Sequence, residues 1–239
     1  MKLASIDPSD APLHGSLMGN DFWETNAEQW AKVIDARAIA SRAVTNPAIL
    51  NAALGCKPRS VLDLGCGEGW MAPEFQSRQI SYLGLDGSSK LVEIAQKKYG
   101  PHFEHRSYED LIGLKTDAKD KNAIAPVDAV VLNYSLLDEK LLPLFQAIKN
   151  LVNPGGSIVI QTLHPCFVLK PYQDGWRDED FKTLPATDAE PLKFQGTMPW
   201  YGRTLSSWLK LFGDAGLRVD KTIEPLGADG PVSIIFILK

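Results

Sequence analysis

The chain has little of what marks secreted, zinc-stabilised or membrane-spanning proteins. Only three of its 239 residues are cysteines, Cys56, Cys66 and Cys166, and no two of them form a CxxC pair. An odd number of widely spaced cysteines argues against a disulfide framework and against a structural zinc site. The first twenty residues lack the apolar core of a signal peptide, and no run of 18 apolar residues occurs. We therefore expect a cytoplasmic protein without a membrane span.

An excess of positive charge is also missing. The chain has 25 Lys and Arg residues against 29 Asp and Glu residues, which gives a formal net charge of −4. Such a surface has no general attraction to phosphate backbones or anionic lipids, so the charge balance argues against nucleic acid as a partner. The four histidines form no ligand set with the cysteines, and we expect no bound metal.

The length and the hydrophobic fraction of 44% fit one α/β domain with a sizeable core. Residues 1–20 are rich in Pro, Gly, Ser and Asp and are expected to form a flexible arm, which leaves residues 21–239 as a single domain. Trp30 and Ile34 follow helical spacing in the segment after this arm, and Pro47 is the expected end of that helix.

Short apolar segments alternate with helical stripes along most of the chain, and seven of these segments are expected to be strands. They are Ser60–Leu64, Tyr82–Leu85, His102–His105, Val127–Leu132, Ser157–Gln161, Leu217–Ile223 and Val232–Leu238. Strands separated by helices should pair in parallel through right-handed crossovers. Only Glu224–Pro231 joins the last two strands, which is too short for a helical crossover, so these two should pair antiparallel.

The expected fold is therefore α/β and Rossmann-like. It is a doubly wound, mostly parallel seven-stranded sheet with an antiparallel C-terminal strand and helices on both faces. Residues 164–203 interrupt the alternation after the fifth strand, with five prolines and several aromatic residues. We interpret this segment as a lid or substrate insertion.

Three glycines alternate directly after the first expected strand, in the segment Val61–Gly69 (VLDLGCGEG). Glycine lets a backbone turn tightly and approach a ligand closely, and the following helix presents free N–H groups. Asp86 lies at the tip of the second strand, 23 residues after Asp63. An acid at this place can accept hydrogen bonds from both hydroxyls of a ribose. The pattern predicts a cofactor that contains adenosine.

The spacing and charge of the loop distinguish between two such cofactors. Dinucleotide-binding loops follow G-x-G-x-x-G, whereas Gly65, Gly67 and Gly69 are one residue closer together. Asp63 and Glu68 flank this loop, and a pyrophosphate there would meet like charges, each pair costing about 4 kcal/mol at 4 Å and an effective dielectric constant of about 20. S-adenosylmethionine (SAM) instead carries a sulfonium and an ammonium group, which acids attract.

The same segments resemble those of a known family. Val61–Gly69 is similar to motif I of the class I SAM-dependent methyltransferases, D/E-x-G-x-G-x-G, and Asp86-Gly87-Ser88 is similar to the ribose-binding segment of that family. Leu151–Gly156 (LVNPGG) resembles the turn before the family's fifth strand. The resemblance runs from about residue 22 to the C-terminus. It is nearest to small-molecule methylases that resemble ubiquinone-biosynthesis methyltransferases.

This resemblance implies a cofactor site made by the glycine loop and by the ends of the second, third and fourth strands. The implied residues are Asp63, Gly65, Cys66, Gly67, Asp86, Gly87, Ser107, Tyr108 and Asn133. One position departs from the family pattern, because Ser107 stands where an acid usually contacts the adenine amino group. Adenine recognition then falls to the Ser107 hydroxyl, to the Tyr108 backbone or to Glu109. For Asn133, an ordinary strand-ending turn is the alternative to a cofactor contact.

His164 is the candidate catalytic residue. It follows the fifth strand, at the carboxyl edge of the sheet where ligands of α/β proteins bind. Because an imidazole titrates near neutral pH, it can act as a general base on a substrate hydroxyl or amine. A structural histidine is the alternative.

Aromatic residues and one arginine of the insertion are candidates for substrate binding: Tyr172, Trp176, Trp200, Tyr201 and Arg203. They predict a flat apolar pocket for an aromatic or anionic small molecule, with Arg203 contacting an anionic group. Ordinary packing of a loop is the alternative. We assign Trp30 to core packing and Arg42 to a solvated helix face, ahead of roles at the cofactor.

The predicted function is transfer of a methyl group from SAM to an O, N or C nucleophile of a small molecule, with S-adenosylhomocysteine as the product. The sulfonium is an activated donor, so alignment for in-line displacement can supply most of the rate. Two alternatives remain open: an NAD-dependent oxidoreductase on the same fold, and a non-catalytic module that binds SAM.

Overall fold

A computed structural model describes residues 16–113, 123–181 and 193–239 of the chain. Most of the expected N-terminal arm, residues 1–15, lies outside this part, and residues 16–20 already belong to the first helix. Among the described helices, none is long and apolar enough to cross a membrane.

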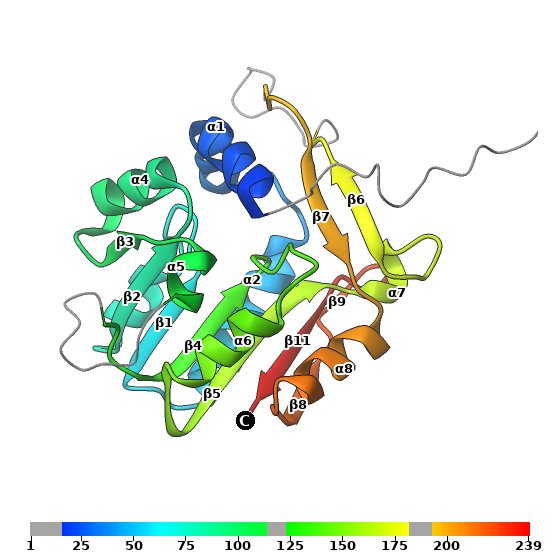
Figure 1. Ribbon diagram of the computed structural model, residues 1–239. Coiled ribbons are helices and arrows are strands. Elements are labelled where there is room, and N and C mark those ends of the chain that lie inside the picture. Colours follow the sequence, from blue (N-terminus) through cyan, green and yellow to red (C-terminus); the bar gives the residue numbers. More distant parts are fainter. Residues whose placement is uncertain (1–15, 114–122, 182–192) are drawn as a thin grey trace, which may run out of the picture.

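Seven strands form the central sheet in the order β3-β2-β1-β4-β5-β11-β8 (Figure 1). The strands are β1 (Ser60–Leu64), β2 (Ser81–Asp86), β3 (Phe103–His105), β4 (Val127–Asn133), β5 (Val152–Leu163), β8 (Val219–Ile223) and β11 (Ser233–Leu238). The first five pair in parallel, and β11 pairs antiparallel with both β5 and β8. The predicted mostly parallel sheet with one antiparallel strand is therefore confirmed.

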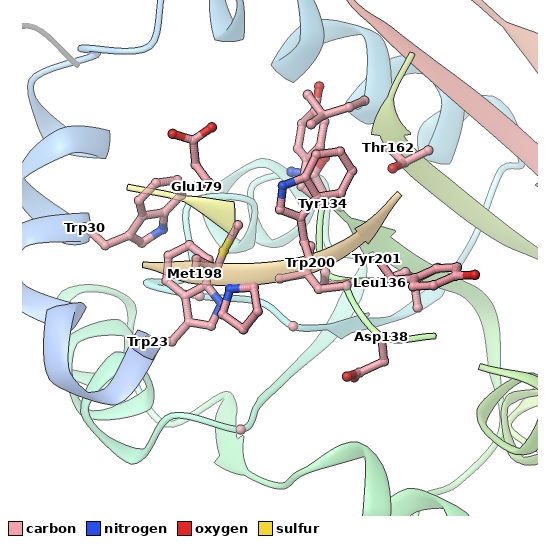
Figure 2. Close-up of a pocket in the computed structure, with 18 of the residues that line it drawn as sticks. Trp23, Trp30, Tyr134, Leu136, Asp138, Thr162, Glu179, Met198, Trp200 and Tyr201 are labelled. Atoms are coloured by element: carbon pink, nitrogen blue, oxygen red, sulfur yellow. The ribbon is translucent and has the colours of Figure 1, made fainter. Parts of the chain in front are cut away.

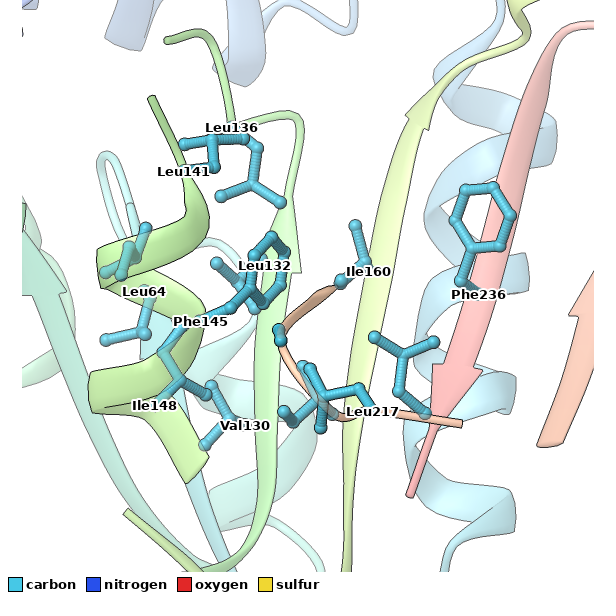
Figure 3. Close-up of a cluster of buried hydrophobic side chains, with 14 of the residues drawn as sticks. Leu64, Val130, Leu132, Leu136, Leu141, Phe145, Ile148, Ile160, Leu217 and Phe236 are labelled. Atoms are coloured by element: carbon cyan, nitrogen blue, oxygen red, sulfur yellow. The ribbon is translucent and has the colours of Figure 1, made fainter. Parts of the chain in front are cut away.

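Helices cover both faces of this sheet. One face packs against α5 (Tyr108–Ile112), α6 (Leu142–Lys149) and α8 (Leu205–Asp214), where Phe145, Phe212 and Phe236 are fully buried (Figure 3). The other packs against α2 (Arg42–Gly55), α3 (Ala72–Gln76) and α4 (Ser89–Tyr99). Each large apolar side chain removed from water in this way contributes about 1.5–3 kcal/mol to folding.

Pro47 does not end a helix, contrary to the sequence-based prediction. The first helix, α1 (Ser16–Asp35), ends earlier, before Arg37 with its left-handed φ of 52°, and Pro47 lies inside α2. Proline removes one backbone hydrogen bond from a helix. Here Ile49 and Ala53 are fully buried beneath the sheet, and their burial favours continuation of the helix past Pro47.

Helix α1 and a two-stranded hairpin lie above the carboxyl ends of the parallel strands. The hairpin of β6 (Gly175–Glu179) and β7 (Met198–Gly202) stands beside α1 above this edge (Figure 1). It follows a short helix, α7 (Pro165–Val168). A second small hairpin, β9 (Leu226–Gly227) with β10 (Gly230–Pro231), precedes the last strand. The expected insertion thus contains a two-stranded sheet, apart from residues 182–192, which lie outside the described part.

Candidate active site

The glycine loop after β1 is held against the end of β2. Gly65, Gly67 and Gly69 have φ angles of 74°, 59° and 84°, in the left-handed region that favours glycine. The N–H groups of Gly65 and Cys66 both donate to the carbonyl oxygen of Leu85, over 2.8 and 3.0 Å. The loop is therefore fixed by the sheet before any ligand binds.

The glycines of this loop face different surroundings. A Cβ atom on Gly65 would collide with the side chain of Ser135. A Cβ atom on Gly67 would have no neighbour nearer than Nε1 of Trp30, at 3.9 Å. Gly65 thus allows close packing between two loops, whereas Gly67 keeps its side of the loop open.

Asp86, at the tip of β2, joins the strand to the loop. Its Oδ2 atom accepts a hydrogen bond from the N–H of Gly67 at 2.7 Å, and its Oδ1 atom accepts one from the N–H of Ser88 at 2.8 Å. Burial raises the pKa of Asp86, while these two hydrogen bonds oppose the rise. Each carboxylate oxygen still has a lone pair for a further donor.

Glu68 and Arg42 are buried charges of opposite sign near the loop. Oε1 of Glu68 and Nη1 of Arg42 are both inaccessible to solvent and have no hydrogen-bond partner among the described residues. Burial raises the pKa of Glu68 to about 7, and the charge of Arg42 opposes the rise. Arg42 also lies over the ring of Trp30, 5.3 Å from its centroid. The expectation of a solvated Arg42 is therefore wrong for its guanidinium end, which lies against the loop.

Asp63 lies behind the loop. Its side chain is fully buried and its Oδ2 atom accepts a hydrogen bond from the hydroxyl of Tyr82 at 2.7 Å. Burial raises the pKa of Asp63 to about 7, and the nearby acids Asp86 and Glu68 add to the rise. Asp63 therefore supports the loop from the core side.

Ser107 and Tyr108 begin α5, but only the second reaches the candidate pocket. The Ser107 hydroxyl accepts from the N–H of Asp110 at 3.2 Å and forms a capping box with that residue. The Tyr108 hydroxyl donates to the carbonyl oxygen of Ser135 at 3.1 Å. Burial raises the pKa of Tyr108, so this phenol stays protonated at physiological pH.

The segment after β4 crosses the site. Asn133 ends the strand, and its Oδ1 atom is buried without a partner among the described residues. Tyr134 has a left-handed φ of 57°, a conformation that costs a residue with a side chain about 1–2 kcal/mol. The Ser135 hydroxyl donates to the carbonyl oxygen of Leu64 at 2.7 Å, which joins this segment to the glycine loop.

These parts line a cavity of about 390 Å³, and Figure 2 shows side chains from its walls. The glycine loop, Asp86, Gly87 and the whole segment Asn133–Asp138 line it from the sheet. Trp23 and Trp30 of α1 and the β6–β7 hairpin line it from above. A cavity of this size, with aromatic walls and charged groups at particular places in them, is typical of a small-molecule site.

The hairpin brings most of the predicted substrate residues into this cavity. Trp176 and Tyr201 face each other across the two strands, with ring centroids 5.5 Å apart, and Trp200 lines the same wall. Tyr172 does not line the cavity. It is 48% exposed, and its hydroxyl accepts a hydrogen bond from the N–H of Leu205 at 3.0 Å.

Arg203 also lines the cavity, yet most contacts of its guanidinium group are made with other residues of the chain. Nη2 donates to the carbonyl oxygens of Asp138, at 2.6 Å, and of Glu139. The guanidinium lies over the rings of Tyr201 and Trp208, 4.8 and 5.2 Å from their centroids. Arg203 therefore fixes the segment after β4 to the hairpin, with Nη1 left without a hydrogen-bond partner among the described residues.

His164 lies beside the cavity and is not among the residues that line it. It precedes α7, its side chain is 7% exposed, and its Nε2 atom is 2.7 Å from Oε1 of Glu224. The ring stacks edge-on with Phe167. This arrangement connects the end of β5 to the end of β8.

Several wall residues were not identified from the sequence. Trp23, Asp138, Glu179 and Phe181 carry no motif. Trp23 and Glu179 reach the cavity because α1 and the β6–β7 hairpin fold over the sheet, whereas Asp138 reaches it from the segment after β4. Trp30, assigned to the core, lines the cavity as well. Within the described ranges, no group of three or more His, Cys, Asp or Glu residues is arranged to hold a metal ion.

Comparison with known proteins identifies related sequences. A family model described as a methyltransferase domain matches residues 22–222. Malonyl-[acyl-carrier protein] O-methyltransferase of Halalkalibacterium halodurans is 28% identical over 184 residues, which are 70% of this chain and 60% of that protein. The chain thus spans about 60% of the length of this curated relative.

Solved structures with the same fold include two that cover nearly the whole chain. The DhpI complex with SAM and HEP has a TM-score of 0.64 at 14% identity and covers 96% of this chain and 100% of its own. Magnesium protoporphyrin IX methyltransferase from Synechocystis PCC 6803, with bound SAH, has a TM-score of 0.61 at 16% identity and covers 94% and 99%. At these identities the likeness shows the fold alone.

Proposed function

The chain belongs to the methyltransferase-domain family, and we propose that it transfers a methyl group from SAM to a small molecule held in the cavity. One observation carries this proposal. Glu68 and Arg42 both line the cavity at the glycine loop, and each has one buried polar atom, Oε1 and Nη1, without a hydrogen-bond partner in the described part of the chain. The amino-acid end of SAM has one ammonium and one carboxylate group, which match this pair in number and sign.

The rest of the cofactor fits the groups that follow along the sheet edge. Asp86 has lone pairs left for the two ribose hydroxyls, and Gly67 lets the backbone approach the ligand closely. The Tyr108 side chain lines the cavity beside Asp86 and offers a face for adenine, whereas Ser107 is occupied by its capping box. A dinucleotide fits less well, since its pyrophosphate would meet Glu68 and Asp86.

When bound, SAM supplies an electrophilic methyl group on a positively charged sulfur. The chain's own residues then bind, align and exclude water. Asn133 would direct its unpartnered Oδ1 atom toward the cofactor, and Trp176, Trp200 and Tyr201 would enclose the acceptor. We propose that residues 164–203 act as a lid, because their described part forms the cavity wall opposite the sheet.

Calorimetric titration tests this function directly. We expect the purified protein to bind SAM and S-adenosylhomocysteine saturably, and NAD not at all. Binding of NAD alone would replace the proposal with an oxidoreductase. Binding of SAM without formation of S-adenosylhomocysteine, in the presence of any acceptor tried, would favour a non-catalytic module instead.

A further inference from the structure

Asp138 is a cavity-lining carboxylate that no motif identified. It ends the segment Asn133–Asp138, every residue of which lines the cavity. This segment starts at the glycine loop, where Ser135 donates to Leu64, and ends at the hairpin. Asp138 therefore stands on the acceptor side of the cavity, three residues beyond the contact with the glycine loop (Figure 2).

The backbone around Asp138 is held firmly. The N–H of Tyr201 donates to the carbonyl oxygen of Leu137 at 2.7 Å, and Nη2 of Arg203 donates to that of Asp138 at 2.6 Å. The side chain is half-buried, and its carboxylate makes no hydrogen bond to any described residue. A rigid backbone that presents an unpaired, partly desolvated acid to a cavity is the arrangement expected of a group that meets a ligand.

The charges around Asp138 do not neutralise it. Burial, and then the nearby charge of Glu109, raise the pKa of Asp138, and Arg203 lowers it. Arg203 stops short of an ion pair with this carboxylate and gives Nη2 to two backbone carbonyls. Glu179 adds a further acid to the same cavity. Apart from Glu68, Arg42 and Asp86, which we assign to the cofactor, three carboxylates and one cation line the walls: Glu109, Asp138 and Glu179, with Arg203. This balance favours a cationic ligand over an anionic one.

The aromatic walls favour the same class of ligand. Trp23 and Trp30 pack with centroids 5.0 Å apart on one side, and Trp200 and Tyr201 line the other. Trp30 and Tyr201 each have an arginine over one face, so Trp23 and Trp200 are the two rings that we assign to the ligand. The faces of such rings attract cations, by about 0.5–2 kcal/mol each when the cation is desolvated. An organic ammonium ion fits these walls in two ways, because the acids and ring faces attract its charge and the aromatic side chains pack against its apolar part.

From this arrangement we propose that Asp138 binds the acceptor as a protonated amine and takes the proton that must leave before methylation. The proposal rests on the proposed methyltransferase function. The ammonium N–H bond breaks and the proton moves to Oδ of Asp138, which leaves a nitrogen lone pair free. That pair forms the new N–C bond while the S–C bond breaks and its electrons stay on sulfur. The product is the methylated ammonium, S-adenosylhomocysteine and a proton passed from Asp138 to solvent.

The test uses the full chain saturated with S-adenosylhomocysteine and three probes of similar shape. These are phenethylamine, 2-phenylethanol and 3-phenylpropionate, titrated calorimetrically. We expect phenethylamine to bind at least tenfold more tightly than either of the others. Asp138→Asn keeps the size of the side chain and should abolish this preference. Glu139→Gln removes an exposed charge one residue away and should preserve it.

The rate of methyl transfer gives a second readout, which would not depend on pH in this way if Asp138 had only a structural role. With SAM and phenethylamine, kcat/KM of the wild type should exceed that of Asp138→Asn by about 100-fold at pH 7, in line with the loss of a general base. The ratio should shrink as the pH approaches the amine's own pKa, because solvent then removes the proton. Unfolding curves should match in all three proteins.

The outcomes separate the two proposals. If the protein fails to bind SAM, the methyltransferase function itself is overturned. If it binds SAM but prefers 3-phenylpropionate, or binds none of the probes better than the others, the amine class is overturned and the function stands. A preference for the amine that survives Asp138→Asn would overturn the role of Asp138.

Discussion

The Oδ2 atom of Asp86 accepts a hydrogen bond from the backbone N–H of Gly67 at 2.7 Å. This contact joins the tip of β2 to the glycine loop that follows β1, so the two motifs of the sequence form one unit in the structure. The Oδ1 atom of Asp86 accepts a hydrogen bond from the N–H of Ser88. The Ser88 hydroxyl in turn caps α4 by accepting a hydrogen bond from the N–H of Leu91 at 3.2 Å. A ligand that contacts Asp86 therefore meets a carboxylate whose position is fixed from two sides.

Asp86→Asn should weaken cofactor binding without unfolding the protein. The amide keeps the size of the side chain but loses the charge that strengthens its hydrogen bonds, each worth about 1.5–3 kcal/mol. We expect the Kd for SAM to rise about 10- to 100-fold in calorimetric titration, while the circular dichroism spectrum stays unchanged. Asp35→Asn is the control, since Asp35 pairs with Lys98 at the surface and should not affect the Kd. An unchanged Kd in Asp86→Asn would disprove the ribose assignment.

Alanine at two positions of the glycine loop should have different consequences, a larger loss of stability at Gly65 and a loss of cofactor binding at Gly67. Gly65→Ala places a Cβ atom into Ser135 and forces a side chain into a φ of 74°, so we expect a loss of about 2–4 kcal/mol in the free energy of unfolding. Gly67→Ala meets only open space toward Trp30 and should cost about 1–2 kcal/mol. Its Cβ atom, however, points to the cavity and should weaken SAM binding. Urea unfolding and calorimetry distinguish the two effects, and equal stability losses would contradict the close packing of Gly65 against Ser135.

Local patterns in the sequence predicted the sheet, and they singled out the glycine loop and Asp86, which meet in the structure. Strand periodicity, the glycine spacing and Asp86 all depend on neighbours in the chain, and the short link between the last two strands predicted their antiparallel pairing. The prediction that a helix ends at Pro47 was wrong because it considered only the local sequence. There, burial of Ile49 against the sheet outweighs one lost backbone hydrogen bond.

The acceptor side was less predictable, because it depends on elements that meet only in three dimensions. Asp138 is one acid among many in the sequence, and the contacts that hold its backbone in the cavity wall come from Tyr201 and Arg203, more than 60 residues later. Arg42 has the spacing of a solvated helix residue, yet its guanidinium is buried opposite Glu68. No local pattern encodes either relationship.

The buried Glu68 should make the stability of the free protein depend on pH. Burial raises its pKa from the ordinary value of 4.5 to about 7 in the folded chain. The folded chain thus binds more protons than the unfolded chain between these values, so stability is fully present below pH 4.5 and falls as the pH rises to about 7. The difference amounts to roughly 3 kcal/mol for Glu68.

Glu68→Gln removes this contribution and tests it. We expect the difference in Tm between pH 5 and pH 8 to be smaller in the variant than in the wild type. Glu74→Gln, which removes an exposed acid paired with Arg78, should keep the wild-type difference. Asp63 contributes in the same direction, so some pH dependence should remain. An identical pH dependence in Glu68→Gln and the wild type would contradict the raised pKa of this buried carboxyl group.

A catalytic role and a positioning role of His164 predict different effects of mutation. Its Nε2 atom lies 2.7 Å from Glu224, and the ring is absent from the cavity wall, so we expect it to hold β5 and β8 together. His164→Ala should then lower the free energy of unfolding by about 1–2 kcal/mol. His164→Gln can still donate from its amide to Glu224 and should restore most of that loss.

Turnover of the same two variants separates the roles. If His164 only positions its neighbours, kcat with an amine acceptor should fall less than about tenfold in His164→Ala, and the Gln variant should recover it. A general base would behave differently, because its loss costs about 100- to 10,000-fold and a glutamine amide cannot accept the proton. A loss of that size in both variants, at unchanged stability, would return the catalytic role to His164 and would leave Asp138 to bind the acceptor.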